Sequence, residues 1–205
     1  MSDRSAQPAS AGRPALRHPF RRKNFRLRLL PLYGVAAAAF WLAVPTPGSL
    51  VLGGVVLGLG EGLRLWATGH LVKTRSLTST GPYAYLRHPL YLGTLLLGLG
   101  FGLAGGRATA LLVAGLFVPV FAFYYIPYKE RVETERLLAR YGEPYAEYHR
   151  AVPALWPRST PWRPAGSRPA DGSWSFERVK ENDELGALLG VTLGVAALWF
   201  RAQLG

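Results

Sequence analysis

The sequence predicts an all-α protein, a polytopic membrane helical bundle of about five transmembrane helices with a cytoplasmic helical extension. Two observations predict this class. Hydrophobic residues make up 49% of the 205 residues and gather in dense blocks. A helix crosses the hydrocarbon core of a bilayer with roughly 20 largely apolar residues. Five blocks approach that length, at 29–44, 48–68, 89–104, 108–127 and 185–200.

Lys and Arg side chains lie on alternate connections between these blocks. They are Arg17, Arg21, Arg22, Lys23, Arg26, Arg28, Lys73, Arg75, Arg87, Lys129, Arg131, Arg136, Arg140 and Arg150. The opposite connections, 45–47 and 105–107, carry a single Arg. Because basic loops stay on the cytoplasmic side, we expect a bacterial inner-membrane protein whose N-terminus is cytoplasmic. The net charge of +12 then indicates topology and contact with the lipid bilayer, and we expect no nucleic-acid partner.

The segments around the blocks give the domain organisation. Residues 1–28 are basic and rich in Ser, Pro and Ala, so we expect a largely disordered tail without a signal peptide. Residues 29–157 are predicted as the membrane core, 158–184 as a Pro-rich linker, and 185–205 as a C-terminal apolar helix and fifth span. The absence of cysteine excludes disulfides, thiolate catalysis and zinc–thiolate sites, and no metal site is predicted.

Helix-breaking residues join the blocks in pairs. Pro-Thr-Pro-Gly at 45–48 joins the first two blocks, and Ala-Gly-Gly-Arg at 104–107 joins the third and fourth, so both hairpins return their polar ends to one side. Within the second block, Glu61 and Arg64 lie three residues apart on one helical face. We expect either an ion pair between them or an Arg64 that reaches the lipid headgroups.

The fourth block continues beyond the membrane. Residues 128–141 keep the helical register, with an apolar stripe beside charged positions, so we expect one unbroken helix to leave the bilayer. Gly142 suits a left-handed helix stop. Pro144 suits the first turn of a short following helix that carries Tyr145 and Tyr148.

The string Gly-Pro-Tyr-Ala-Tyr-Leu-Arg-His-Pro-Leu-Tyr at 81–91 places a turn, an Arg-His pair and a helix start directly before the third block. Pro89 suits the first position of that helix, since its missing N–H costs nothing there, and it forces His88 into an extended conformation. The helix dipole and the free N–H groups of the first turn then favour an anion. The expected donors around it are Arg87, His88, Leu90, Tyr91 and Leu92.

Aromatic side chains gather at the same corner, namely Tyr83, Tyr85 and Tyr91. An aromatic face attracts a cation within about 6 Å of the ring, so the corner suits a ligand with both an anionic and a cationic group. A second pole is Glu133, whose carboxylate can hold an amino group or ribose hydroxyls, with Lys129 four residues before it. The structural alternatives are an interfacial aromatic belt and a solvated Lys–Glu pair.

This string, followed by Glu-Thr-Glu-Arg-Leu-Leu-Ala-Arg-Tyr-Gly-Glu-Pro-Tyr-Ala-Glu-Tyr-His-Arg-Ala-Val-Pro at 133–153, resembles the isoprenylcysteine carboxyl methyltransferase and phospholipid methyltransferase superfamily of integral membrane enzymes. The resemblance covers about 71–157. It implies a methyltransferase that uses S-adenosylmethionine, a cofactor with an α-carboxylate and a cationic sulfonium. The cofactor-binding residues expected from the resemblance and from the neighbouring Arg87 are Arg75, Ser76, Leu77, Thr78, Tyr83, Arg87, His88, Pro89, Leu90, Tyr91 and Glu133.

Two positions depart from the pattern of that superfamily. Lys129 stands where an Arg usually contacts the methyl acceptor, with Arg131 nearby, and Thr134 stands where a second Glu is common. A guanidinium fork binds a carboxylate through two hydrogen bonds and an ammonium does not. Whether the methylated group is a carboxyl or an amine therefore stays open.

The resemblance implies methyl transfer to a lipid-like or isoprenoid acceptor, a lipophilic small molecule that enters between the spans. Such an in-line displacement needs donor and acceptor aligned at about 3–3.5 Å, and Glu133 or His88 can remove a proton from an amine. Lys129 and Arg131 complete the catalytic candidates. Two other classes of function stay open, namely an NADPH-dependent membrane reductase related to sterol reductases and a non-catalytic membrane scaffold.

Overall fold

A computed structural model describes residues 34–72, 76–164 and 173–204. The predicted tail at 1–28, Arg75 and the first part of the block at 29–44 lie outside the described residues. The chain divides into two units, 1–36 and 37–205. The fold described below is that of the second unit.

All regular structure in the described ranges is helical, as the sequence predicts. Within the described residues, three helices are long and apolar enough to cross a membrane, namely α2 (Pro47–His70), the helix at Arg107–Tyr141 and α8 (Glu184–Leu204). A fourth apolar helix, α3 (Pro89–Ala104), has 16 residues and extends about 24 Å at 1.5 Å per residue, short of the roughly 30 Å hydrocarbon core. The described part of the chain therefore has three helices of spanning length, where the sequence predicts about five over the whole chain.

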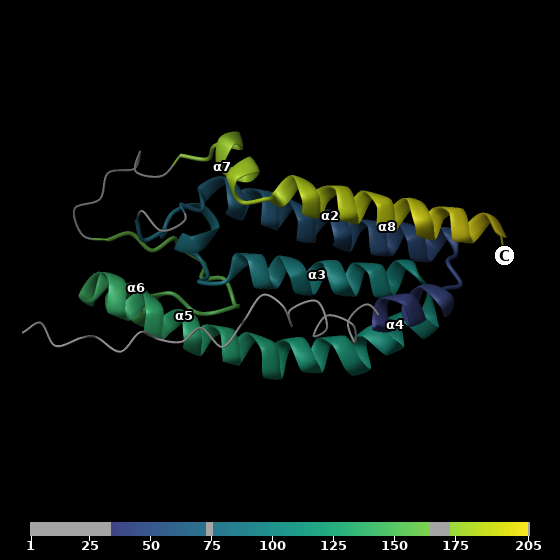
Figure 1. Cartoon of the computed structure of the whole chain (residues 1–205), viewed down its shortest axis with the longest axis horizontal. Helices are drawn as coiled ribbons and strands as arrows, with labels where there is room; N and C mark the ends of the chain where they lie inside the picture. The colour runs from purple at the N-terminus through teal and green to yellow at the C-terminus, as the bar shows by residue number, and fades with distance from the viewer. Residues whose placement is uncertain (1–33, 73–75, 165–172, 205) are drawn as a thin grey trace, which may run out of the picture. The chain divides into compact units, whose positions relative to one another are not determined.

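The first two long elements, α2 and α3, lie side by side (Figure 1). Thr46 is the N-cap of α2 and accepts a hydrogen bond from the Ser49 amide, with Pro47 in the first turn. A Cβ atom added at Gly60 would lie 3.0 Å from the Gly93 carbonyl oxygen, and one added at Gly93 would lie 2.5 Å from Arg64, both inside van der Waals contact. The two backbones approach closely because glycine has no side chain, which is how helices commonly pack in membranes.

The segment Arg107–Tyr141 forms one continuous helix, which confirms the predicted unbroken helix. It comprises α4 (Arg107–Leu112), two π-helical stretches at Val113–Phe117 and Val120–Tyr125, and α5 (Ile126–Tyr141). Pro119 lies between the two π stretches and has no N–H for the regular i to i−4 ladder. Wider π turns are a known adjustment of such a helix.

A short helix, α6 (Glu143–Ala151), follows α5 directly. Gly142 separates the two with φ 60°, which confirms the predicted stop in the region of positive φ. Tyr145 and Tyr148 of α6 are buried at 2% and 3% exposure and form a core cluster with their neighbours. The extension beyond the spans is therefore a packed element.

The C-terminal apolar run forms α8, which lies beside α2 and contacts α3 (Figure 1). The preceding residues 158–184, predicted as a linker, contain a further helix, α7 (Phe176–Glu181). Val179 of α7 is completely buried. The sequence prediction missed α7 because its six residues carry no long apolar period.

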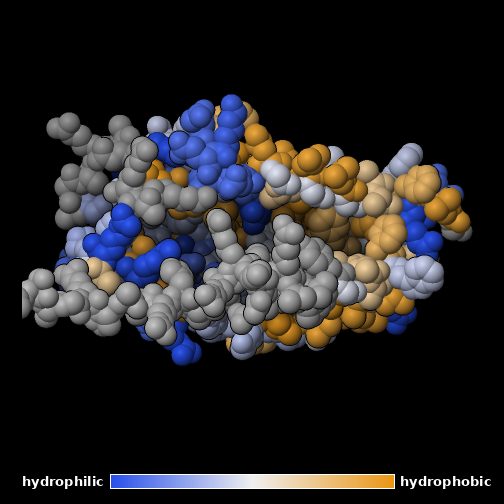
Figure 2. All heavy atoms as spheres, viewed as in Figure 1, coloured by the Kyte–Doolittle hydropathy of each residue, from blue (hydrophilic) through white to orange (hydrophobic). Residues whose placement is uncertain are grey.

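Large apolar side chains cover the outer faces of the helices. Trp41 and Phe123 are 82% and 80% exposed, and Leu189, Leu193 and Trp199 of α8 are also exposed. Figure 2 shows hydrophobic residues over the α8 and α4 side, and hydrophilic residues at the end where α6 and α7 lie. Exposed apolar faces of this extent fit helices whose solvent is the bilayer.

The expected ion pair between Glu61 and Arg64 is wrong. Arg64 pairs instead with Glu184 at the start of α8, where Nε donates to Oε1 at 2.6 Å and Nη2 to Oε2 at 2.9 Å. Its Nη1 donates to Thr94 of α3 at 2.7 Å. Both carboxylate oxygens of Glu61 are buried without a hydrogen-bond partner among the described residues.

We expect Glu61→Gln to unfold at the wild-type temperature or a higher one. Its free energy of unfolding should differ from that of the wild type by at most about 1 kcal/mol. Glutamine keeps the volume of the side chain and removes the cost of a charge without a partner inside the bundle. Thermal unfolding in detergent measures the difference. Glu177→Gln, at an exposed position of α7, is the control, and a marked loss of stability confined to Glu61→Gln would contradict the expectation.

Candidate functional site

The predicted turn and helix start are both present. Gly81 has φ 59°, a conformation that glycine adopts without steric cost, and it opens a 3₁₀ turn at Gly81–Ala84. Pro89 is the first residue of α3, and His88 is its N-cap with φ −121° and ψ 59°. Arg87 and His88 therefore stand at the N-terminal end of α3.

The expectation of three free amides at this helix start is wrong for two of them. The amides of Tyr91 and Leu92 both donate to the carbonyl of His88 at 3.1 Å. The amide of Leu90 has no backbone acceptor among the described residues. The His88 carbonyl thus accepts from two of the three amides. The Leu90 amide is left as a backbone donor for an anion.

Arg87 connects α3 to two other helices. Its Nη1 donates to the carbonyls of His149 at 2.7 Å and Val152 at 2.5 Å, at the end of α6, and its Nη2 pairs with Glu130 of α5. Its Nε is buried without a partner in the described part of the chain. The guanidinium is therefore mainly a structural clamp, and its Nε is a donor that no described residue uses.

A segment that follows α6 holds the same corner through its backbone. Four N–H···O bonds of 2.8–3.0 Å join 84–88 to 153–162. The pairs, with the donor first, are Arg87–Pro153, His88–Ala154, Arg158–Tyr85 and Trp162–Ala84. Because these hydrogen bonds hold the backbone at 84–88, the side chains of Arg87 and His88 leave it in defined directions.

Three side chains from two helices meet beside the start of α3. The hydroxyl of Tyr91 donates to Glu133 Oε1, and His88 Nδ1 lies 3.7 Å from Glu133 Oε2. The His88 imidazole stacks on the Tyr91 ring at 5.0 Å, and its Nε2 is buried without a partner among the described residues. Lys129, by contrast, lies 5.8 Å from the ring of Tyr125 and makes no ion pair with Glu133 in the described structure.

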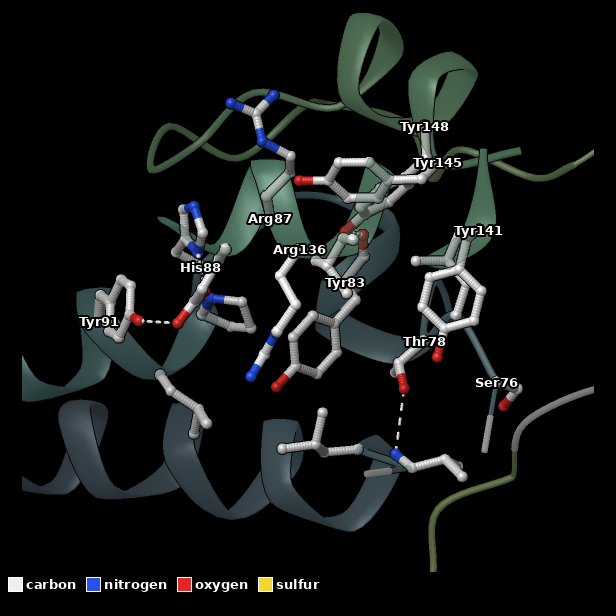
Figure 3. Close-up of a pocket in the computed structure, with 17 residues that line it drawn as sticks. Ser76, Thr78, Tyr83, Arg87, His88, Tyr91, Arg136, Tyr141, Tyr145 and Tyr148 are labelled. Carbon is white, nitrogen blue, oxygen red and sulfur yellow. Dashed lines mark hydrogen bonds and ion pairs between the residues drawn. The ribbon is translucent and has the colours of Figure 1, made fainter. Parts of the chain in front are cut away.

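A cavity of about 400 Å³ opens beside this cluster (Figure 3). Its walls come from the residues after α2, from the corner at 83–91, from α5 and from α6. Arg136 extends into it between His88 and Tyr83 (Figure 3). The volume lies within the range of roughly 300–1,000 Å³ that is usual for small-molecule sites.

The structure brings nearly all predicted cofactor-binding residues to this cavity. The ones that line it are Ser76, Leu77, Thr78, Tyr83, Arg87, His88, Pro89, Leu90, Tyr91 and Glu133. Arg75 lies outside the described residues. Of the catalytic candidates, Glu133 and His88 line the cavity, whereas Lys129 and Arg131 do not.

Sequence reasoning missed seven lining residues. They are Leu71, Val72, Arg136, Leu137, Tyr141, Tyr145 and Tyr148. Helical periodicity could have found Arg136, Leu137 and Tyr141, which follow Glu133 by three, four and eight residues and so share its face. Tyr145 and Tyr148 depend on how α6 folds back after Gly142, which periodicity does not give.

The cavity combines anion-binding and cation-binding groups. Burial raises the pKa of Tyr83 and of Tyr148, so both rings stay neutral and present uncharged aromatic surface. Tyr148 uses its hydroxyl to donate to the carbonyl of Tyr83 at 2.8 Å. Glu133 and these rings suit a cationic group, while the Leu90 amide, His88 Nε2 and the Arg136 guanidinium suit an anionic one.

The buried imidazole gives a pH-dependent prediction. Burial lowers the pKa of His88 below its usual 6.5, against the opposing effect of Glu133 and Glu130 and with the help of Arg87. The stability that depends on neutral His88 is therefore fully present above about pH 6.5 and is lost as pH falls through the lower folded-state pKa.

We therefore expect the unfolding temperature to drop between pH 7.5 and pH 5, and expect His88→Gln to reduce that drop. Thermal scans in detergent at several pH values measure it. His149, whose pKa is also lowered by burial, titrates nearby, so His149→Gln is the comparison. An equal drop in wild type and His88→Gln would contradict the assignment.

Comparison with known proteins gives one family and two curated relatives. Residues 49–143 match the family described as phospholipid methyltransferase. The cobalt-zinc-cadmium resistance protein CzcN of Cupriavidus metallidurans is 36% identical over 120 residues, which cover 58% of this chain and 53% of that protein. The nickel-cobalt-cadmium resistance protein NccN of Alcaligenes xylosoxydans xylosoxydans is 32% identical over 102 residues, 49% of this chain and 46% of that protein.

The chain thus spans about half the length of the curated relatives it matches. No solved structure matches it. The matched segment runs from the first turn of α2 to the start of α6, and so contains α3, the helix at Arg107–Tyr141 and the His88–Glu133 cluster. Through residues 49–143, just under half of its length, the chain is similar to the phospholipid methyltransferase family.

Proposed function

We propose that this protein is an integral membrane methyltransferase that takes a methyl group from S-adenosylmethionine and transfers it to a lipid-like or isoprenoid acceptor. The family supports the reaction class. The observation that carries the proposal is the cavity, where residues 76–91 and Glu133 converge at one end of the apolar helices. A polar cofactor and a lipophilic acceptor can meet at such a boundary.

The residues present fit this cofactor. His88 Nε2 and Arg87 Nε are buried donors without partners in the described structure, and a carboxylate would satisfy such donors. The neutral rings of Tyr83 and Tyr148 and the Glu133 carboxylate suit a sulfonium and an amino group. When bound, the cofactor supplies an electrophilic methyl group.

The chain itself then aligns the reactants and keeps water out. Tyr91 donates a hydrogen bond to Oε1 of Glu133, and the His88 imidazole lies 3.7 Å from Oε2, so the carboxylate has a defined orientation. If the acceptor is an amine, the Glu133 carboxylate accepts its proton at Oε2, because His88 Nε2 carries the hydrogen that it would donate to the cofactor carboxylate. If it is a carboxylate, it is already a nucleophile, and the work of the site is alignment.

We place the protein in a bacterial membrane, with the cavity on the cytoplasmic side. The bacterial relatives and the apolar helices support a bacterial membrane. The basic residues of the connections at the cavity end support a cytoplasmic orientation. Both partners then follow: the bilayer around α2 and α8, and an acceptor that enters from it.

A methyl-transfer assay tests the proposal. Purified protein in vesicles of bacterial total lipid receives S-adenosylmethionine with a radiolabelled methyl group, and the organic extract is counted and separated. We expect label in a lipid fraction, whose identity then names the acceptor. Label that never enters the extract with any lipid or isoprenoid acceptor, from protein shown to be folded, would contradict the proposal.

The names of the two relatives suggest a second readout. Both refer to metal resistance, and the described residues contain no group of three or more His, Asp or Glu placed to hold a metal ion. We infer that any effect of this chain on metal tolerance depends on methyl transfer. Expression of wild type and of Glu133→Gln in a cadmium-sensitive host tests this, and equal protection by both would contradict it.

A further inference from the structure

The last carbonyls of α2 receive hydrogen bonds from the segment around α7. A helix leaves its final four carbonyls without intrahelical partners, and here donors far along the chain bind two of them, those of Thr68 and Gly69. Asn182 Nδ2 donates to the carbonyls of Thr68 at 3.0 Å and Leu71 at 3.1 Å. The Ser175 amide donates to the Gly69 carbonyl at 2.9 Å.

Two more side chains complete this contact. Trp174 Nε1 donates to the Leu65 carbonyl at 3.1 Å, and Arg178 Nη1 to the Gly69 carbonyl at 3.3 Å. The Trp174 indole lies directly over Gly69, where a side chain would collide with it. Residues 174–182 therefore form one cap, which we call the α7 cap, over the end of α2.

The start of α8 anchors the α7 cap inside the bundle. Glu184 is 2% exposed and accepts two hydrogen bonds from Arg64 of α2, while Arg64 also donates to Thr94 of α3. A paired arrangement of this kind is held firmly, because separating its members would leave a buried charge without a partner. The cap is thus fixed to α2 at both of its ends.

The capped end of α2 continues directly into the wall of the cavity. Leu71 and Val72, the residues after α2, line it, and the Val72 amide donates to Thr78 Oγ1, another lining residue, at 3.0 Å. Figure 3 shows Tyr83 pointing from the opposite wall toward α2. Asn182 itself does not line the cavity, so its effect on a ligand is indirect.

We propose that the α7 cap is a positioning element of the cofactor cavity, with Asn182 as its central residue. This inference rests on the proposed function for the identity of the ligand. The cap holds the end of α2 so that Leu71, Val72 and Thr78 keep the shape of the cavity wall. Residues 174–184 lie outside the matched family segment.

Asn182→Asp is the sharpest test, because it keeps the size of the side chain and replaces the donating NH₂ by an acceptor facing two carbonyls. We expect the KM for S-adenosylmethionine to rise about fivefold or more, as for a lost buried hydrogen-bond pair, with kcat at saturation and the KM of the acceptor unchanged. Gln203→Glu, which adds the same charge at an exposed position near the end of α8, is the matched control.

Gly69→Ala is a second test of the α7 cap, since its methyl group displaces the Trp174 indole and leaves the Asn182 side chain unchanged. The same rise in KM is expected. Unchanged KM in both variants would overturn the proposal, and so would a fall in kcat with KM unchanged, which would indicate a general structural defect.

Hydrogen exchange without any ligand separates this inference from the proposed function. In Asn182→Asp we expect faster amide exchange in peptides covering 65–72 and 76–80, and no change at 107–112. If wild-type protein binds no S-adenosylmethionine, the proposed function fails and the exchange result alone decides: faster exchange at 76–80 supports the positioning role, and wild-type exchange there overturns it.

Discussion

Replacing Arg87 with glutamine is expected to lower the unfolding temperature by roughly 6–12 °C, the equivalent of about 3 kcal/mol for a chain of this size. The guanidinium serves the carbonyls of His149 and Val152 and the carboxylate of Glu130 at once. Its side chain is only 10% exposed, so water cannot fully replace these contacts. Glutamine reaches at most one of them.

Thermal unfolding in detergent measures this effect, and Arg107→Gln, at an exposed position near the opposite end of the helices, is the control. Arg87→Lys keeps the charge without the fork and is expected to fall between wild type and Arg87→Gln. If Arg87→Gln unfolds within a degree of wild type, Arg87 is not a clamp and stays available for a ligand.

Glu133→Gln is expected to have the largest effect on activity. The substitution keeps the size of the side chain and one acceptor for Tyr91, but removes the charge that faces His88 and any bound cation. A hydrogen bond to a charged group is worth about 1.5–3 kcal/mol, so we expect affinity for S-adenosylmethionine to fall roughly 10- to 150-fold. Methyl transfer at subsaturating cofactor falls at least as far.

Calorimetric titration gives the affinity of Glu133→Gln, and its unfolding temperature shows whether the fold is kept. The matched control is Glu135→Gln, on the same helix at an exposed position that does not line the cavity. Equal losses in both variants would indicate a general electrostatic effect. Wild-type affinity in Glu133→Gln would remove this residue from the site.

Local signals made much of the fold predictable. Pro89 starts α3 and Gly142 ends α5, because each residue restricts or frees the backbone whatever surrounds it. The apolar blocks predicted α2, α8 and the long helix before Gly142, because the length and composition of each block are also local properties of the sequence. The amides of Tyr91 and Leu92 were mispredicted because the His88 carbonyl, which depends on the N-cap conformation, accepts from both.

Partners distant in sequence were not predictable. Arg64 and Glu184 are 120 residues apart, and helical spacing favours only the neighbouring Glu61 as a partner. Arg87 likewise reaches carbonyls that α6 brings near only after the chain turns at Gly142. The site could be predicted where a motif is contiguous, and could not where a third segment, such as the α7 cap, completes it.

The central claim is that the cavity between His88, Glu133 and Tyr83 receives S-adenosylmethionine. Calorimetric titration of the purified protein in detergent with S-adenosylmethionine, its demethylated product and NADPH tests it most directly. The account predicts saturable binding of the first two at one site per chain, weakened by Glu133→Gln, and no binding of NADPH. Binding of NADPH alone would contradict it.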